Sequence, residues 1–308
     1  MNHKLIVLIG ILIATVLVIA GVYTLITPSH ESINDKLDNG TEKNIEFSQS
    51  GAHLPKLTVD AEKLEKNAKP SFEVGRKYKY QNTIQEVVEQ SYCTGGVCIT
   101  KNETLTKNIP SEFAVEKIER VDGKDCYVVS RVRIMKISDE EKAAKRMNEE
   151  MVKSMEDYFN SQRTYYYYDK ETGKCIMQKY SDINGISKTF TKDWAEYSTR
   201  DPAILFSDWM LALNDNFMWE QKAEISDEAQ GTTTQEVFEY TVKGREKVNG
   251  RECFKVEINK KIEETSGEKY KTEEIDLVWI DVKERIMVKT TVKYEGVITS
   301  EIELTDEQ

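Results

Sequence analysis

Residues Glu119–Val129 read ERVDGKDCYVV, and residues Glu246–Val256 read EKVNGRECFKV. Five of the eleven positions are identical, and five more exchange similar residues. A second pair follows the two segments, with YYYD at Tyr166–Asp169 and VWID at Val278–Asp281. Internal similarity at matched spacing indicates a repeated structural unit. The sequence therefore predicts a duplicated β-rich unit.

The turns inside the two segments predict antiparallel hairpins. Asp122-Gly123 and Asn249-Gly250 are dipeptides that readily take the positive φ angles of a two-residue hairpin loop. After the second turn, residues 254–259 (FKVEIN) alternate apolar and polar side chains. Such alternation is typical of a half-buried antiparallel strand. We therefore expect a mainly β (α+β) fold, a duplicated antiparallel sheet or half-barrel with one or two packed helices.

The first copy is expected at residues 71–199 and the second at 216–308. Each is predicted to open on an aromatic-x-aromatic strand, at Tyr78–Tyr80 in one and Phe238–Tyr240 in the other. On this alignment 45 residues separate Tyr80 from Cys126, against 12 between Tyr240 and Cys253. The first copy is therefore expected to carry an insertion.

Two helices are predicted. One begins at Ser138, where Glu141 completes a capping box, and runs to about Asn160. The other is a bridging helix over residues 200–215, with Asp201 as its N-cap and Pro202 at its first position. We expect it to connect the two copies.

The N-terminal residues predict a membrane anchor. Leu5–Ile26 is an uncharged run of 22 residues, long enough to cross the hydrocarbon core of a bilayer. A transmembrane anchor is assigned to residues 1–28, with a cleaved secretory signal as the alternative. Lys4 and the α-amino group precede the run, which places the N-terminus in the cytoplasm and the bulk of the chain outside, in a single-pass arrangement. Residues 29–70 are polar and are predicted to form a flexible stalk.

Charge and histidine content exclude several classes of function. The formal net charge of −11 argues against a nucleic-acid partner. Only three histidines are present, His3, His30 and His53, all before the predicted folded part. A Ser-His-Asp triad or a His-ligated zinc site therefore cannot be built there. We expect a protein that is not an enzyme and needs no cofactor, although a carboxylate-only enzyme stays open.

The five cysteines of an external chain predict disulfide chemistry. Cys93 and Cys98 flank a four-residue loop and are the favoured pair, with a metal site as the disfavoured alternative. Cys175 could pair with Cys126. Cys253 is expected on the same strand face as Lys255, where a partner could reach it.

Two acceptor patterns for N-glycosylation are present. Asn39-Gly40-Thr41 and Asn102-Glu103-Thr104 both match the pattern. Matches this short also arise by chance, so modification of Asn39 and Asn102 depends on an external location.

Methionines recur on the first predicted helix. Met147, Met151 and Met155 lie at i, i+4 and i+8, and Phe159 follows. Such a stripe can line an adaptable pocket for an apolar ligand. The alternative interpretation is that it packs the helix onto the sheet.

The Tyr78–Tyr80, Gly123–Tyr127 and Tyr166–Asp169 motifs carry a resemblance. The chain resembles lipoprotein-localisation carriers (LolA/LolB-like) and related external lipid-binding half-barrels, and uncharacterised archaeal membrane-anchored surface proteins, over about residues 72–304. The resemblance implies a hydrophobic groove, but it identifies no ligand contact. The duplication and the permanent anchor depart from a small soluble carrier.

These observations predict a membrane-anchored extracytoplasmic binding module. Its ligand would be a lipid or another apolar molecule, held between the sheet and the 138–160 helix. The alternative is a structural or assembly component of the cell envelope that acts through protein-protein contacts, at sheet edges or at the Cys253 face.

Overall fold

The computed structural model describes residues 44–45, 54–56, 64–94, 97–181, 187–190, 192–201, 203–227, 232–264, 270–294 and 297–307. The predicted anchor at Leu5–Ile26, the predicted cytoplasmic N-terminus and the acceptor Asn39 lie outside these residues. Within the described ranges, no helix has both the length and the apolar character needed to cross a membrane.

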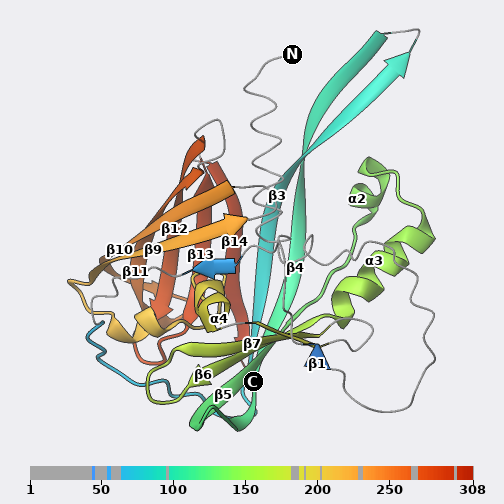
Figure 1. Cartoon of the computed structure of the whole chain (residues 1–308). Helices are drawn as coiled ribbons and strands as arrows, with labels where there is room; N and C mark the ends of the chain where they lie inside the picture. Colours follow the sequence, from blue (N-terminus) through green and yellow to red (C-terminus); the bar gives the residue numbers. More distant parts are fainter. Residues whose placement is uncertain are drawn as a thin grey trace, which may run out of the picture. The chain divides into compact units, whose positions relative to one another are not determined.

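The described chain forms one large sheet, as expected for a mainly β fold (Figure 1). Its strand order is β1-β8-β7-β6-β5-β4-β3-β14-β13-β12-β11-β10-β9-β2, and every pair is antiparallel except β1 with β8. The strands are β1 (Asn44–Ile45), β2 (Leu54–Lys56), β3 (Lys77–Thr94), β4 (Val97–Val121), β5 (Lys124–Arg133), β6 (Arg163–Asp169), β7 (Cys175–Ser181), β8 (Ser187–Phe190), β9 (Met218–Asp227), β10 (Thr232–Val248), β11 (Arg251–Glu264), β12 (Tyr270–Asp281), β13 (Met287–Tyr294) and β14 (Val297–Glu307).

Twelve of these strands, β3 to β14, form two runs of neighbouring strands. The runs β3–β8 and β9–β14 each follow chain order, and β14 pairs with β3 to join them. The sheet continues from one run to the other through backbone hydrogen bonds.

The two similar segments have the same local structure. Each forms a hairpin with a two-residue loop, β4–β5 through Asp122-Gly123 and β10–β11 through Asn249-Gly250. The φ angles are 50° and 79° in the first loop and 51° and 78° in the second. The predicted positive-φ turns are confirmed. Each hairpin also has a register shift at a matching place, after Val115 and after Val242.

The predicted alignment of the opening strands is wrong by one strand. The hairpins make β10 the counterpart of β4, so Tyr240 corresponds to Phe113 and not to Tyr80. The predicted insertion is instead a long hairpin of β3 and β4, 18 and 25 residues in length. It extends beyond its neighbours, because β14 and β5 pair with it only as far as Ile84 and Ser111 (Figure 1).

The predicted helix at 138–160 is two helices. Helix α2 (Asp139–Ala144) begins after Ser138, whose hydroxyl accepts a hydrogen bond from the Glu141 N–H at 3.1 Å. Helix α3 (Glu149–Ser161) has its own N-cap, Asn148. Arg146, with φ of 53°, lies between them. The chain breaks there because a left-handed residue ends the first helix and a capping side chain starts the second.

The predicted bridging helix at 200–215 is not formed. Helix α4 (Lys192–Ser198) ends before it, and only a 3-10 helix, η1 (Asp208–Ala212), follows. Residues 204–213 are all buried, which leaves no polar face for a surface helix. Side chains satisfy the backbone carbonyls that a helix would have used. These bonds run from Tyr168 Oη to Phe206 O (2.9 Å), from Asn67 Nδ2 to Ala212 O (2.8 Å) and from Arg285 Nη1 to Leu213 O (3.0 Å).

Part of the predicted stalk belongs to the folded structure. β1 and β2 pair with the sheet edges. Leu64 and Ala68 pack against the hydrophobic core, and the Asn67 N–H donates to Leu211 O at 2.9 Å. The polar composition of this segment predicts a flexible stalk, but backbone hydrogen bonds and a few apolar side chains are enough to hold part of it against the fold.

Candidate functional site

The methionine stripe is partly exposed to solvent. Met151 is 51% exposed and Met155 37%, whereas Met147 falls in the turn between α2 and α3. The buried residue of α3 is Val152. The interpretation that the methionines pack the helix onto the sheet is therefore wrong for Met151 and Met155. Phe159 is half-buried. Binding of an apolar ligand by these residues stays a prediction.

The cysteines divide into two groups. Cys93 and Cys98 are directly opposed partners of the β3–β4 hairpin, a register that brings them together. Their disulfide stays a prediction. Cys126, Cys175 and Cys253 are free and buried, so the proposed Cys126–Cys175 pair and the accessible Cys253 are both wrong. Cys253 is covered because it belongs to the main hydrophobic core, and its neighbour Phe254 is buried as well, so β11 is buried on both faces at this point.

Asn102 lies on β4 opposite Glu89, and its side chain is exposed. Glycosylation at this position stays a prediction.

One face of β9–β12 brings together polar side chains from four strands. The register places Gln221, Phe238, Lys260 and Glu274 in one row across the strands. The next row holds Trp219, Tyr240, Ile258 and Asp276, and Glu236 lies one row to the other side. Directly opposed residues in a sheet share a face, so all of these side chains project the same way.

The segment between β8 and β9, described over residues 192–201 and 203–217 and called the connector below, covers this face. The Trp209 ring lies 5.0 Å from the Tyr240 ring between centroids, and the Tyr197 hydroxyl donates to Glu236 Oε2 at 2.9 Å. The Arg200 guanidinium lies 5.2 Å from the centre of the Trp219 ring. We call this the covered face, and we call Gln221, Glu236, Lys260, Glu274 and Asp276 the covered-face cluster.

Several polar groups of the covered face lack a hydrogen-bond partner. Gln221 is 2% exposed, and neither Nε2 nor Oε1 is bonded. Asp276 is also 2% exposed, with Oδ1 unbonded. The hydroxyl of Tyr240 and Nε1 of Trp219 are also buried without a hydrogen-bond partner. An unpaired buried polar group costs about 1–3 kcal/mol, and native proteins hold few of them. Four on one face indicate a place for another molecule or for water.

The cluster contains three carboxyl groups, those of Glu236, Glu274 and Asp276, and one amine, that of Lys260. Lys260 Nζ lies 3.6 Å from Glu236 Oε1. Burial alone would lower the pKa of Lys260, but the nearby carboxylates of Glu236, Glu274 and Asp276 outweigh it and raise the pKa. Burial raises the pKa of Asp276 well above its ordinary value, and the charge of Glu274 adds to the effect. Burial likewise raises the pKa of Glu274.

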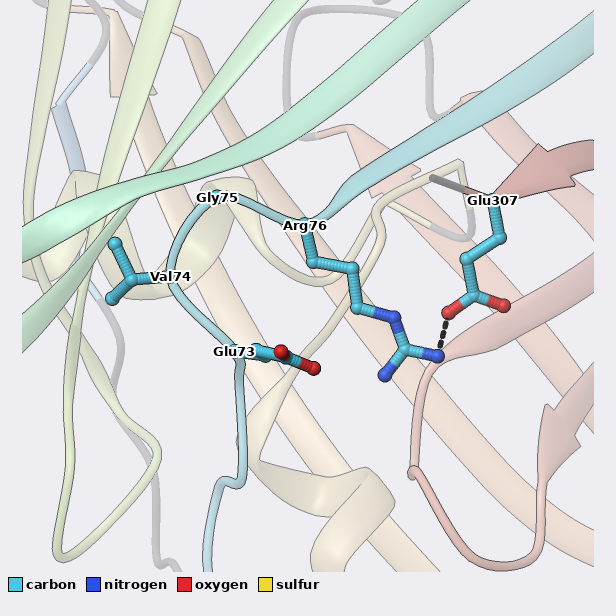
Figure 2. A pocket seen from close by; sticks show the side chains of 5 residues that line it. All are labelled: Glu73, Val74, Gly75, Arg76 and Glu307. Atoms are coloured by element: carbon cyan, nitrogen blue, oxygen red, sulfur yellow. Dashed lines mark ion pairs between the residues drawn. The ribbon is translucent and has the colours of Figure 1, made fainter.

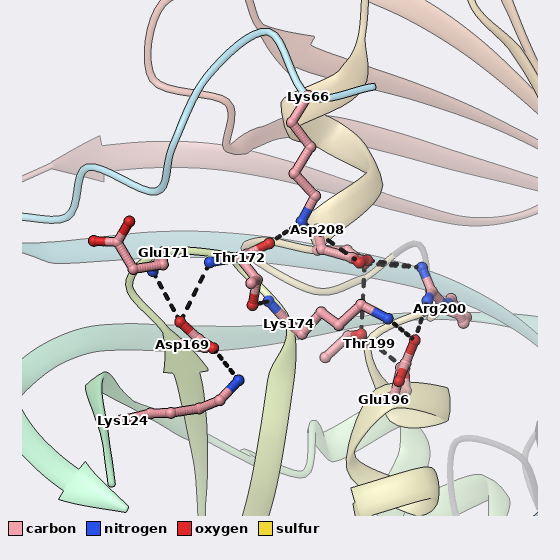
Figure 3. Close-up of polar contacts among 11 residues, drawn as sticks. Lys66, Lys124, Asp169, Glu171, Thr172, Lys174, Glu196, Thr199, Arg200 and Asp208 are labelled. Carbon is pink, nitrogen blue, oxygen red and sulfur yellow. Dashed lines mark hydrogen bonds and ion pairs between the residues drawn. The ribbon is translucent and has the colours of Figure 1, made fainter. Parts of the chain in front are cut away.

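A chain of ion pairs holds the connector in place (Figure 3). Arg200 joins Asp208 at 3.1 Å and Glu196 at 3.3 Å, and Glu196 also accepts Lys174 at 3.3 Å. Lys66 lies 3.9 Å from Asp208 and donates to the Thr172 carbonyl. Both Arg200 and Asp208 are buried, so loss of either would leave an uncompensated buried charge. This network holds the connector against the sheet. Its charged groups are already paired with one another, so they do not form a separate ligand site.

A pocket of about 680 Å³ is lined by Glu73, Val74, Gly75, Arg76 and Glu307. Arg76 pairs with Glu307 and extends away from the backbone of Gly75 (Figure 2). Glu284 pairs with Arg76 at 3.0 Å, so the arginine is already matched by carboxylates. Arg76, the cation of this pocket, is therefore not free to bind an anionic ligand.

The sequence contained one signal for the covered-face cluster. Lys260 and Glu236 stand where the alternation of their strands calls for apolar residues, in step with Ile258 and Phe238. Strand register, which joins Gln221 to these residues, could not be read from the sequence. In the described part of the chain, no group of three His, Cys, Asp or Glu side chains could hold a metal ion.

The sequence matches no family model and no curated protein. Solved structures with some similarity include a protein with a YmcC-like fold from Bacteroides fragilis, with TM-score 0.30, 8% identity, and coverage of 78% of this chain and 98% of that one. Others are a DUF1329 family protein from Desulfovibrio piger (0.27, 10%, 76% and 85%) and the hypothetical lipoprotein YmcC from Escherichia coli (0.27, 10%, 77% and 90%). TM-scores this low transfer no function, and nothing here supports the archaeal resemblance.

Proposed function

We propose that this protein is a membrane-anchored extracytoplasmic binding module whose ligand occupies the covered face of β9–β12. The observation that carries the proposal is Gln221, a fully buried amide with neither polar atom bonded, beside the charged cluster. A binding protein keeps such groups because the ligand completes their hydrogen bonds. The proposal assigns no catalytic step.

The anchored, external location rests on Leu5–Ile26, the uncharged run of 22 residues. A tethered receptor samples ligands next to the membrane without diffusing away. The buried charges favour a polar ligand over the lipid expected from the methionine stripe, because a hydrocarbon chain cannot pair with Asp276 or Gln221.

The test compares full-length protein in detergent with its Gln221→Leu and Glu236→Gln variants. Each is dialysed against a small-molecule extract of the expressing cells, and retained compounds and extracted lipids are quantified by mass spectrometry. We expect at least one polar compound that the wild type retains and both variants lose. Glu239→Gln, on the opposite face of β10, is the matched control and should retain it.

Gln221→Leu is informative because it separates binding from folding. Replacing an unbonded buried amide with an apolar side chain of similar size should leave the free protein equally or more stable. Retention of the same compounds by wild type and both variants, or of none by the wild type, contradicts the proposal. Retention of lipid alone would instead support the lipid or other apolar ligand expected from the sequence.

A further inference from the structure

When its carboxyl groups are ionised, the covered-face cluster has a deficit of positive charge. Its ionisable members are three carboxylates, Glu236, Glu274 and Asp276, and one amine, Lys260. Lys260 lies at ion-pair distance from Glu236. Within the described ranges, Asp276 and Glu274 form no ion pair with another residue, and Asp201 adds another negative charge nearby.

The unbonded oxygens around the deficit are hydrogen-bond acceptors. Asp276 Oδ1, the Tyr240 hydroxyl and Gln221 Oε1 can all accept. Tyr240 lies in the row of Asp276, and Gln221 lies in the next row with Lys260 and Glu274. A protonated amine has three donors and no acceptor, so it matches this set in charge and in hydrogen bonding.

Aromatic rings next to the cluster also favour a cation. Trp219 and Tyr240 lie 5.0 Å apart between ring centroids. Lys260 Nζ lies 5.5 Å from the Phe238 ring, and Arg200 lies over Trp219. The rings of Trp219 and Phe238 thus already contact cations of the protein, and ring faces attract positive charge more strongly when they are shielded from water.

We infer that the covered-face cluster binds a small polar molecule through a protonated amine, with Asp276 and Glu274 as its counter-charges and Gln221 holding a neutral polar part of the same molecule. This inference rests on the proposed function and names the ligand class of that site. A metal ion is a poorer match, since the described carboxylates do not converge on one point.

The test uses pairs of probes that differ only in the amine. Glucosamine is compared with N-acetylglucosamine, and putrescine with 1,4-butanediol, by isothermal titration of the full-length protein in detergent. Binding is expected for at least one amine and for neither neutral counterpart. Asp276→Asn should weaken amine binding about tenfold or more, because it removes a charge-assisted hydrogen bond. Glu239→Gln, across the strand, should leave it unchanged.

Two further variants, Glu274→Gln and Gln221→Leu, distinguish failure of the amine inference from failure of the proposed site. Glu274→Gln tests the half-buried carboxylate, so the inference does not depend on the folding of one variant. Equal binding of amines and neutral counterparts, lost in Gln221→Leu, would overturn the amine and keep the proposed site. If neither amine binds and dialysis shows that the wild type retains a neutral compound, the amine is likewise overturned and the proposed site is kept. Amine binding unaffected by Asp276→Asn and Glu274→Gln would place it elsewhere and overturn the inference.

Discussion

Asp169 and Asp281 hold equivalent positions in two turns that lie 112 residues apart along the chain. In each, Oδ1 accepts hydrogen bonds from the N–H groups of the second and third residues that follow. In each, Oδ2 pairs with a cation from the preceding hairpin, Lys124 at 2.5 Å or Arg251 at 3.0 Å. The repeat therefore preserves the contact between neighbouring turns as well as the strands.

The two aspartates should differ in their contribution to stability. Asp281→Ala is expected to lower the free energy of unfolding by about 2–3 kcal/mol and Asp169→Ala by about 1–2 kcal/mol, by urea denaturation. Arg251 is mostly buried and is shared with Glu284 and Glu307, whereas Lys124 is half exposed. Equal losses would show that the wider network around Arg251 adds nothing.

Asp169 also predicts an acid-dependent loss of stability. Burial alone would raise the pKa of Asp169, but hydrogen bonds from Lys124 and from two backbone N–H groups outweigh it and lower the pKa. A lowered pKa in the folded state gives stability that is present above the unfolded pKa and is lost as pH falls. Asp169→Asn should therefore flatten the decline in melting temperature below about pH 4. An unchanged acid limb would contradict this.

Gly173 and Gly123 form a matched pair for testing the packing of the connector. Both have positive φ, 69° and 79°, so alanine strains the backbone equally at either position. A Cβ on Gly173 would meet Leu211 Cδ1 at 2.8 Å, whereas one on Gly123 meets nothing within 4 Å. We expect Gly123→Ala to cost about 1 kcal/mol and Gly173→Ala about 3 kcal/mol in thermal or urea unfolding. Similar losses of stability in the two variants would show that the 204–213 segment moves at little cost to accommodate the added Cβ.

The parts of the fold that were predicted correctly depend on local chemistry. The Asp-Gly and Asn-Gly turns specify their own φ angles, so the two hairpins followed from the sequence. The aromatic alternation at Tyr78–Tyr80 also occurs at Phe238–Tyr240, but the two places are not equivalent, because β10 corresponds to β4 and not to β3. The prediction of a helix at 200–215 is wrong because residues 204–213 are buried on every side, whereas a surface helix has one buried and one exposed face. The covered-face cluster depends on register across four strands, which no local pattern encodes.

The three buried cysteines should be unreactive in the folded protein. Burial raises the pKa of Cys126 and Cys253 to about 11 and that of Cys175 to about 12. The thiolate that attacks a disulfide reagent is therefore scarce at pH 8. We expect no reaction of these three with Ellman's reagent until denaturant is added. Three thiols in the denatured, unreduced protein would support the Cys93–Cys98 bridge, and five would exclude it.

The anchor can be tested by fractionation. Full-length protein should stay with membranes through high salt and alkaline carbonate, and deletion of residues 1–28 should release it, because Leu5–Ile26 supplies the apolar run. The intact mass of the native protein separates the alternatives. A mass that lacks the N-terminal residues would identify a cleaved signal in place of an anchor.

The covered face predicts a pH dependence opposite in sign to that of Asp169. Burial raises the pKa of Asp276 well above its ordinary value, so the folded protein holds a proton that the unfolded chain releases. Between the unfolded and the folded pKa, stability must therefore fall as pH rises. Asp276→Asn carries no ionisable group and should reduce this slope, leaving the part that comes from Glu274, whose pKa is also raised. Urea unfolding from pH 4 to 8 measures it, with Gln221→Leu, on the same face and without charge, as the control. A slope equal in the wild type and in Asp276→Asn would contradict a raised pKa of Asp276 in the folded protein.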